Sequence, residues 1–268
     1  MKETIIDRFV RLCYDGFLQG WHERNGGNLS YRMSDEEVKE CSNLFPNKVR
    51  TISLPTSFEE LKGCYFIVTG SGKYMRNVPL YPEKNIGIIR ISEDGSSFDI
   101  LWGLEDGAKP TSELPTHLMN HIARSKVTNG ECRVIYHAHP ANITALTYAI
   151  EPNAKTLTKI LWQSETECAV VFPSGVGIVD WMVPGGIEIA HATAALIKKY
   201  NAVVWAFHGI FGSGKDLDET FGLIHTIEKA AEIYIKAKSL GIVRTISDVQ
   251  FKELAKAFSV ELNSEFLS

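Results

Sequence analysis

The segment 133–140, Arg-Val-Ile-Tyr-His-Ala-His-Pro, constrains the fold more than any other part of the chain. Its run 134–136 consists of β-formers, and the proline ends the predicted strand. Residues two apart on a strand point to the same face, so His137 and His139 project together from the strand end. Two neutral imidazoles side by side are half of a transition-metal site. Taken alone, the pair fits equally well with two surface histidines that happen to alternate.

His208 is the candidate third ligand, since a catalytic zinc site usually has three protein ligands and one open position. It ends a second predicted strand, residues 202–207, and precedes Gly209. A histidine at such a place is more often a hydrogen-bonded core residue, and only the H-x-H pair at another strand end favours a ligand. The remaining histidines are predicted to be solvated or half-buried and without a role: His22, His117, His121, His191 and His225.

Glu113 is the candidate general base beside such a metal. It lies in the segment 111–115, Thr-Ser-Glu-Leu-Pro, where a loop passes into a predicted helix. Carboxylates are stabilised at helix N-termini, so a capping role is the simpler interpretation. The functional interpretation is a carboxyl group whose pKa is set by partial burial and a nearby cation.

Three turns offer donors of the kind that bind phosphate. The first is Asn25-Gly-Gly-Asn28, the second is Thr69-Gly-Ser-Gly-Lys73 with the hydroxyl of Ser71, and the third contains Thr111 and Ser112 before a helix. Backbone N–H groups and hydroxyls in such places form anion sites. Each turn is weak evidence alone, but three of them beside an H-x-H pair favour a phosphate-binding pocket.

A fourth glycine-rich segment resembles a nucleotide-binding loop. Residues 209–216, Gly-Ile-Phe-Gly-Ser-Gly-Lys-Asp, nearly match G-x-x-x-x-G-K-[ST] between a predicted strand and a predicted helix. The last position is Asp216, however, and a carboxylate there would repel phosphates instead of holding Mg²⁺ by a hydroxyl. The mismatch argues against nucleotide binding.

Composition excludes several classes of protein. The 268 residues carry a net charge of -4, which argues against a mainly electrostatic nucleic-acid binder. Five scattered cysteines without C-x-x-C suggest neither a disulfide framework nor a thiolate zinc site, and they fit a reducing cytoplasm. The N-terminus does not read as a signal peptide, and no apolar run is long enough to span a membrane.

The pattern of elements predicts one α/β domain over residues 1–268, with a mixed or antiparallel sheet covered by helices. Helices are expected over residues 2–19, 116–125, 141–150, 153–164, 186–200 and 217–240, and after a capping box of Ser247 and Gln250. Strands are expected at 65–68, 86–91, 98–102, 168–172 and 202–207, besides those at 29–32 and 133–139. Residues 34–60 are expected to form a polar, irregular insertion.

Taken together and in this order, the motifs resemble those of the class II aldolase/adducin-head family. The family's marks stand here as Gly27-Asn28, Thr69 to Gly72, Ser112-Glu113, His137-Ala-His139 and His208-Gly209. A narrower likeness to one aldolase branch of the family runs over nearly the whole chain, through residues 21–29, 66–73, 100–104, 110–115, 183–184 and 207–214. The smaller fuculose-phosphate aldolases lack much of the material at 34–60 and 80–105.

The resemblance implies a zinc-dependent aldolase with one Zn²⁺ per subunit. Such an enzyme would cleave L-rhamnulose 1-phosphate to dihydroxyacetone phosphate and L-lactaldehyde in L-rhamnose catabolism. It also implies a cytoplasmic homotetramer with sites near subunit interfaces, whose partner molecule is a sugar phosphate and neither nucleic acid nor membrane. The implied zinc ligands are His137, His139 and His208, and Glu113 would move the proton at the donor carbon.

The resemblance assigns the remaining site residues as follows. Asn25, Asn28, Ser71, Thr111 and Ser112 would bind the phosphate, and Gly27 the reacting region. Glu167 would reach a neighbouring subunit's site and assist proton transfer at the aldehyde oxygen. The alternatives are a fuculose-phosphate aldolase, a pentulose-phosphate 4-epimerase or a thiosugar-phosphate dehydratase on the same scaffold. A fourth alternative is an adducin-like assembly module without the metal, against which the retained histidines and Glu113 count.

Overall fold

The structure is a computed structural model that describes residues 3–46 and 49–267. Its strands are β1 (Asn28–Arg32), β2 (Arg50–Ser53), β3 (Tyr65–Thr69), β4 (Ile86–Ile91), β5 (Ser97–Gly103), β6 (Val134–Ala138), β7 (Gly177–Val179), β8 (Ala202–Trp205) and β9 (Gly209–Gly214). Its helices are α1 (Ile5–Leu18), α2 (Asp35–Cys41), α3 (Pro82–Asn85), α4 (Leu114–Val127), α5 (Ala141–Leu146), α6 (Ala154–Ser164), α7 (Cys168–Val171), α8 (Ile187–Ile197), α9 (Leu217–Leu240) and α10 (Asp248–Phe258).

The strands of this part of the chain form a nine-stranded sheet in the order β2-β5-β4-β3-β1-β6-β9-β8-β7. Neighbouring strands are antiparallel except for β7 and β8, which are parallel. The predicted α/β fold with a mixed sheet is therefore confirmed. The boundaries 1–268 of a single domain remain a prediction, and residues 1, 2, 47, 48 and 268 lie outside the described residues.

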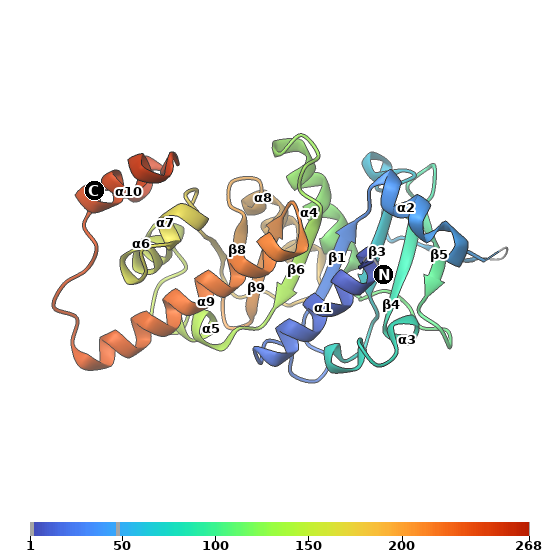
Figure 1. The fold of residues 1–268 in the computed structure, drawn as a ribbon, viewed down its shortest axis with the longest axis horizontal. Helices are drawn as coiled ribbons and strands as arrows, with labels where there is room; N and C mark the ends of the chain where they lie inside the picture. The colour runs from blue at the N-terminus through green and yellow to red at the C-terminus, as the bar shows by residue number, and fades with distance from the viewer. Residues whose placement is uncertain (1–2, 47–48, 268) are drawn as a thin grey trace.

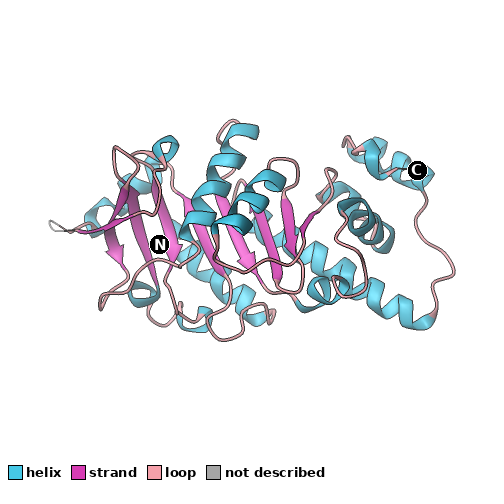
Figure 2. Ribbon diagram, turned by 180° about the vertical axis from the view of Figure 1, so that it is seen from behind, coloured by secondary structure: helices cyan, strands magenta, loops and turns pink. Residues whose placement is uncertain are grey.

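Helices cover both faces of the sheet, and alternate side chains of β6 pack against the helices on opposite faces. Val134 and Tyr136 point into the core shared with α1 and α9, whereas Ile135 points to the opposite face and packs with residues of α4 and α8. Figure 1 shows α1 and α9 in front of the strands, and Figure 2 shows the opposite face of the sheet. His137 follows the alternation of Ile135 and therefore belongs to the face covered by α4 and α8.

Two predicted elements are wrong. Residues 168–172 were expected to form a strand because valine and phenylalanine favour strands, but they form the short helix α7, which packs against α9 and α10. Tertiary packing overrides weak β-propensity in so short a run. Residues 34–60 are not irregular throughout, since they contain the helix α2 and the edge strand β2. A capping box at Ser34 marks the start of α2.

Besides β2, two further strands were missed. β7 is three residues long, and β9 is the glycine-rich segment that resembled a nucleotide-binding loop. Glycine weakens strand prediction, but a Cβ on Gly212 would lie 2.8 Å from Ile224 Cγ1 of α9. Glycine therefore lets the long helix pack closely on the strand. Because residues 209–214 are a paired strand, they form no phosphate-binding loop.

None of the helices in the described residues combines the length with the apolar character that a bilayer span needs.

Three histidines that were expected to be solvated or half-buried are buried: His22, His117 and His121. Each is hydrogen-bonded, as buried polar groups must be. The Nδ1–H of His22 donates to the Gly26 carbonyl oxygen at 3.0 Å, and its Nε2 accepts from the Tyr136 hydroxyl at 2.7 Å. Burial lowers the pKa of His22 to about 4, so this imidazole is neutral in the folded chain at pH 7.

Acid is therefore expected to destabilise the fold through these histidines. The folded pKa of His22 lies below the ordinary 6.5, so the unfolded chain binds the extra proton as the pH falls from about 6.5 to about 4. In chelator, the free energy of unfolding should fall between pH 7 and pH 5, and His22→Gln should make that fall smaller by about 2 kcal/mol. Urea titrations at the two pH values measure it.

His191→Gln is the matched control, because His191 is exposed on α8. Its fall in stability should equal that of the wild-type chain. An unchanged fall in His22→Gln would show that His22 is not held neutral by the fold.

Candidate metal centre and phosphate-binding pocket

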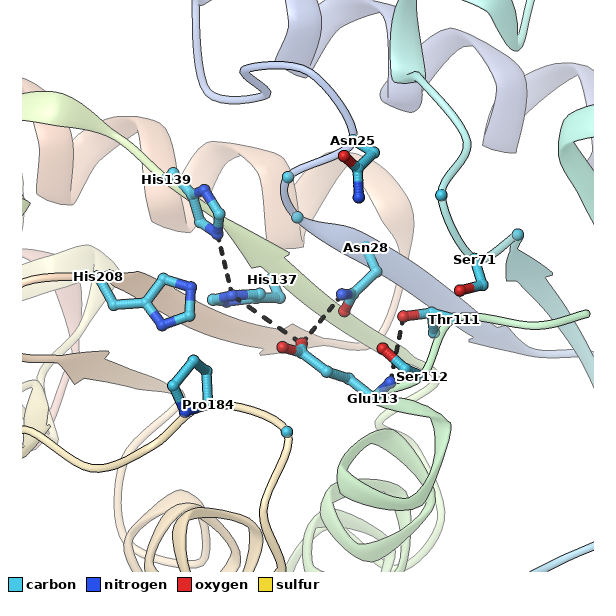
Figure 3. Close-up of a pocket in the computed structure, with 15 residues that line it drawn as sticks. Asn25, Asn28, Ser71, Thr111, Ser112, Glu113, His137, His139, Pro184 and His208 are labelled. Atoms are coloured by element: carbon cyan, nitrogen blue, oxygen red, sulfur yellow. Dashed lines mark hydrogen bonds and ion pairs between the residues drawn. The ribbon is translucent and has the colours of Figure 1, made fainter.

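Several of the predicted site residues lie together at one edge of the sheet. β1 is antiparallel to both β3 and β6, so the start of β1 lies beside the ends of those two strands. In this register Asn28 of β1 is directly opposite His137 of β6. β9 is antiparallel to β6 in turn, which brings its first residue, Gly209, and the adjacent His208 to the same edge. Residues separated by about 180 positions in the chain thus meet at one place (Figure 3).

The three predicted ligands lie together. One ring nitrogen of each of His137, His139 and His208 lies within 4.8 Å of those of the other two. His137 Nε2 is 3.2 Å from His139 Nε2, and the rings of His137 and His208 are 5.0 Å apart between centroids. His137 is buried, whereas the other two are half-buried and face the pocket. The group resembles three ligands with an open fourth side, as in catalytic zinc sites.

The outer nitrogens of two of these rings support a metal. The Nδ1–H of His137 donates to the Ile210 carbonyl oxygen at 3.1 Å, and the Nδ1–H of His139 donates to Glu23 Oε1 at 2.7 Å. Both protons are then on Nδ1, so two Nε2 lone pairs face each other with no proton between them. A cation at that place removes their repulsion, and such outer partners are typical of metal-bound histidines. The donor set therefore fits a transition metal.

The surroundings of His137 and His208 keep these two rings uncharged. The His137 ring stacks on Phe211 with centroids 4.4 Å apart and packs against Trp205 at 5.0 Å. Burial first, and the neighbouring His139 second, hold the pKa of His137 well below its ordinary value. The same two causes lower the pKa of His208 to about 4. Metal binding requires neutral imidazole, so the pocket supplies these two rings in the form that binds.

The turn that carries His208 has unusual backbone geometry. Phe207 has φ of 64°, a left-handed conformation that is rare for a bulky residue, and its N–H donates to Thr147 Oγ1 at 2.9 Å. A Cβ on the following Gly209 would lie 2.3 Å from the Ala138 carbonyl oxygen and 2.9 Å from His139 Cδ2. Glycine is therefore required directly after His208, because the turn passes so close to the H-x-H strand.

Glu113 lies between the histidines and the turns. It immediately precedes α4, and its Oε2 is 4.0 Å from His137 Nε2 and accepts a 2.9 Å hydrogen bond from Asn28 Nδ2. Its role as a helix cap is not observed, because its side chain makes no capping hydrogen bond. Burial raises the pKa of Glu113, while the Asn28 amide opposes the rise. A largely buried carboxyl group with a raised pKa beside a metal-type cluster is suited to proton transfer.

The three predicted turns meet beside Glu113. An isolated bridge pairs Gly70 with Pro110, and the Thr111 N–H donates to the Thr69 carbonyl oxygen at 2.9 Å, so the second and third turns are held together. The first turn enters β1 at Asn28, next to the end of β3. The residues of these turns that line the cavity offer backbone N–H groups, hydroxyls and side-chain amides, all of them neutral donors. Such donors bind phosphate through their dipoles and without a formal positive charge.

All predicted site residues except Glu167 line one cavity of about 280 Å³. The lining residues are Asn25, Gly26, Gly27, Asn28, Gly70, Ser71, Gly72, Thr111, Ser112, Glu113, His137, His139, Pro184, Gly185 and His208. Glu167 is exposed at the start of α7 and is not among them.

Two kinds of site residue were missed. Pro184 and Gly185, in the loop before α8, line one side of the cavity. No sequence pattern within that loop predicted that these two residues would lie at the site. Glu23 and His117 contact site residues from outside the cavity. A signal for His117 existed, because it follows Glu113 at the four-residue spacing that places two side chains on one helix face.

A comparison with models of known families matches residues 7–235 to the Class II Aldolase and Adducin N-terminal domain. The chain belongs to this family. The rhamnulose-1-phosphate aldolase of Klebsiella pneumoniae is 47% identical over 265 residues, which cover 97% of this chain and 96% of the relative. That of Escherichia coli (strain K12 / DH10B) is 48% identical over 260 residues, which cover 97% of this chain and 95% of the relative.

A solved structure agrees with the sequence relatives. The sugar-phosphate aldolase from Thermotoga maritima has a TM-score of 0.74 and 31% identity, covering 89% of this chain and 97% of that one. The predicted family fold, the resemblance to L-rhamnulose-1-phosphate aldolase and the assignment as a metal-dependent aldolase, a carbon–carbon lyase, are confirmed.

The cluster of three histidines makes a direct prediction about metal content. His208→Ala removes one of three converging nitrogens, so the purified variant should contain much less metal than the wild-type chain. His191→Ala, on the exposed side of α8, should keep the wild-type amount. Elemental analysis of both variants after gel filtration measures it, and full metal occupancy in His208→Ala would remove that residue from the ligand set.

Proposed function

We propose that this aldolase cleaves L-rhamnulose 1-phosphate reversibly to dihydroxyacetone phosphate and L-lactaldehyde, as a step of L-rhamnose catabolism in the cytoplasm. One observation carries the proposal: a three-histidine cluster, a largely buried carboxyl group and neutral hydrogen-bond donors suited to phosphate share one cavity. Identity of 47–48% to enzymes named rhamnulose-1-phosphate aldolase, over 97% of the chain, supports the substrate. The five cysteines are all unpaired, which fits a reducing compartment.

In the proposed site, His137, His139 and His208 hold one Zn²⁺ per subunit. When bound, zinc supplies Lewis-acid stabilisation of the negative charge that develops on the donor fragment. Three imidazoles also accept cobalt or iron, so the support for zinc is the family and not the donor set alone. Glu23, through its hydrogen bond to His139, orients one of the three rings.

Glu113 is proposed to move the proton at the donor carbon. Cleavage of a six-carbon ketose into two three-carbon products breaks the bond between C3 and C4, and the electron pair stays on C3. That carbon then takes a proton, which Glu113 gives in cleavage and removes in the reverse reaction. The raised pKa of the Glu113 carboxyl group increases the share of its protonated form and so favours the donation.

The turns are proposed to hold the phosphate at a distance from the breaking bond. Asn25, Asn28, Ser71, Thr111 and Ser112 donate to phosphate oxygens, and Gly27 approaches the reacting region. Binding of this remote group fixes the reacting carbons against Glu113 and the histidine cluster. Their common cavity supports this assignment.

Product analysis tests the proposed reaction against its alternatives. The purified protein is incubated separately with L-rhamnulose 1-phosphate, L-fuculose 1-phosphate and a pentulose 5-phosphate. The proposal predicts dihydroxyacetone phosphate and L-lactaldehyde, formed fastest from the first substrate. Faster cleavage of L-fuculose 1-phosphate would identify a fuculose-phosphate aldolase. Conversion of the pentulose 5-phosphate to its epimer would identify a 4-epimerase, and no reaction with any of the three would favour an assembly module.

Glu113→Gln should separate chemistry from metal binding. Glutamine has the same size as glutamate but is uncharged and transfers no proton, so the cleavage rate should fall about 10²- to 10⁴-fold with the zinc content unchanged. Glu151→Gln, an exposed position, is the control and should behave as wild type. Turnover near the wild-type rate in Glu113→Gln would exclude this residue from the proton transfer.

We also propose a homotetramer in which Glu167 reaches a neighbouring subunit's site and assists proton transfer at the aldehyde oxygen. An apolar rim beside the cavity supports an interface there. Trp181 and Val183 are 62% and 67% exposed, and Phe207 and Tyr148 contact each other with ring centroids 4.7 Å apart while both are exposed. Exposed apolar groups gathered next to a pocket are typical of a covered surface.

Trp181→Glu should disturb this interface, because it places a charge on the apolar rim. The variant should sediment as smaller species than the wild-type tetramer and cleave more slowly. Val243→Glu, at an exposed apolar position in the segment between α9 and α10, should leave both properties unchanged. A wild-type chain that sediments as a monomer would contradict the tetramer, and with it the role of Glu167.

A further inference from the structure

Helix α4 and strand β1 carry polar side chains at matching intervals. Glu113, His117 and His121 follow one another every four residues along the start and first turns of α4. Asn28 and Ser30 are two residues apart on β1 and therefore share a face. Four helical residues rise about 6 Å and two strand residues about 7 Å, so the two rows stay in step.

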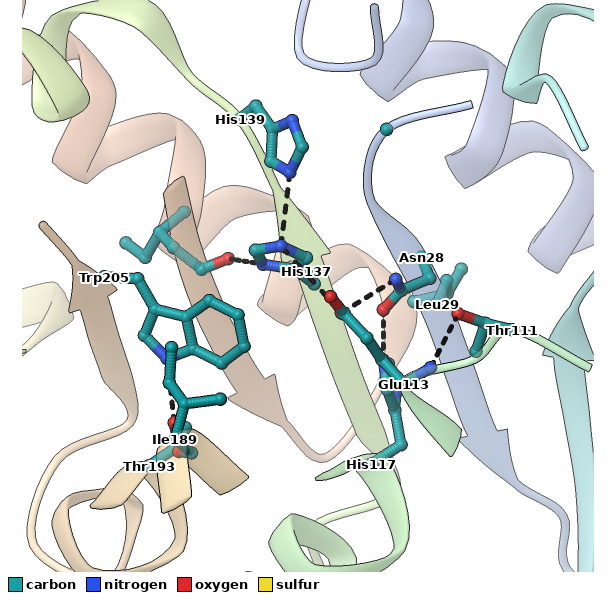
Figure 4. A network of polar contacts seen from close by, with 12 residues as sticks. Asn28, Leu29, Thr111, Glu113, His117, His137, His139, Ile189, Thr193 and Trp205 are labelled. Carbon is teal, nitrogen blue, oxygen red and sulfur yellow. Dashed lines mark hydrogen bonds and ion pairs between the residues drawn. The ribbon is translucent and has the colours of Figure 1, made fainter. Parts of the chain in front are cut away.

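The two rows are joined by an unbroken chain of hydrogen bonds. Asn28 Nδ2 donates to Glu113 Oε2 at 2.9 Å, and Asn28 Oδ1 pairs with His117 Nε2. Ser30 Oγ lies 2.7 Å from His117 Nδ1 and 2.8 Å from His121 Nε2. Figure 4 shows the inner part of this chain, with Asn28 between Glu113 and His117.

The carboxylate at one end sets the direction of every bond. An ionised Glu113 only accepts, so Asn28 turns its NH₂ group toward it and its oxygen toward His117. His117 must then carry its proton on Nε2, and its Nδ1 accepts from the Ser30 hydroxyl. The Ser30 oxygen accepts in turn from the Nε2–H of His121. Rotation of the Asn28 amide by half a turn would place its oxygen against the carboxylate and its NH₂ group against the N–H of His117.

Burial keeps this arrangement in place. His117 has no exposed surface, and His121 and Ser30 are 1% exposed. Burial lowers the pKa of His117 to about 3, so the ring stays neutral and retains the tautomer that Asn28 needs. His117 also packs edge-on against Phe211, the residue on which His137 stacks. A ring held on all sides can fix the orientation of the amide that it contacts.

We propose that His117 is a positioning residue that aims the Asn28 amide and, through it, the Glu113 carboxyl group. The inference rests on the proposed function, because it assigns a role in the proton transfer by Glu113. It adds a residue that contacts neither substrate nor metal in that proposal. Ser30 and His121 hold the His117 ring from behind.

Two substitutions at one position separate this role from mere packing. The amide nitrogen of glutamine reaches about as far as histidine Nε2, whereas that of asparagine reaches only about as far as Nδ1. His117→Gln can still donate to Asn28, and it should keep most of the wild-type kcat. His117→Asn cannot, and its kcat should fall about 100-fold, the loss expected for a displaced reacting group, while KM and bound zinc stay unchanged.

Ser30→Ala is a milder variant in case both substitutions at position 117 unfold the chain. It removes only the hydroxyl behind the ring, and kcat should fall by a smaller factor with KM unchanged. Equal kcat in His117→Gln and His117→Asn would overturn the proposal. So would a rise in KM without a fall in kcat, or wild-type kcat in Ser30→Ala.

Crystal structures of the two His117 variants test the positioning of Glu113 without an activity measurement. The Asn28–Glu113 hydrogen bond should persist in His117→Gln, and the Glu113 carboxyl group should be displaced in His117→Asn. Unchanged Glu113 in both would overturn the proposal. If the wild-type chain does not cleave L-rhamnulose 1-phosphate, the proposed function fails, and these structures still test the positioning.

Discussion

The antiparallel pairing of β1 with both β3 and β6 is the constraint on which the rest of the site depends. It places Asn28 directly opposite His137, and it brings the turn after β3 to the same edge. A slip of one residue would turn Asn28 and Ser30 to the other face of the sheet, away from α4. The hydrogen bonds to Glu113 and His117 would then be lost together, although every residue would remain in the chain. The register of one strand therefore connects the metal-type cluster with the proposed phosphate cradle.

Much of the fold could be predicted because most elements carry strong local patterns. The long helix α9, the hairpin of β4 and β5, and the capping box before α10 all have such patterns and all are present. The errors fall where tertiary packing decides. α7 is too short to have a periodicity of its own. β9 contains glycines because α9 packs closely against it, and close packing of a distant helix leaves no mark in the local sequence except the absence of side chains.

Ten of the fifteen residues that line the cavity could be named from the sequence, because histidine pairs and glycine-rich turns are recognisable by residue type and spacing. His137 and His139 alone already suggest a metal site. The sequence did not predict the buried hydrogen bonds behind the cavity residues. His117 and His22 were expected to be solvated or half-buried, because helices and loops usually expose histidine. They are buried because Asn28, Ser30 and Tyr136 supply partners from distant strands.

The site combines three histidines, a largely buried carboxyl group and uncharged hydrogen-bond donors, so the proposed cleavage requires a bound cation to stabilise the negative charge that it creates. The most direct measurement is the rate of dihydroxyacetone phosphate formation from L-rhamnulose 1-phosphate as metal is removed and restored. The protein is dialysed against a chelator and then titrated with Zn²⁺. We expect cleavage to disappear with the metal and to return in proportion to the zinc bound, up to one ion per chain. Undiminished cleavage by the metal-free protein would contradict the role of the metal.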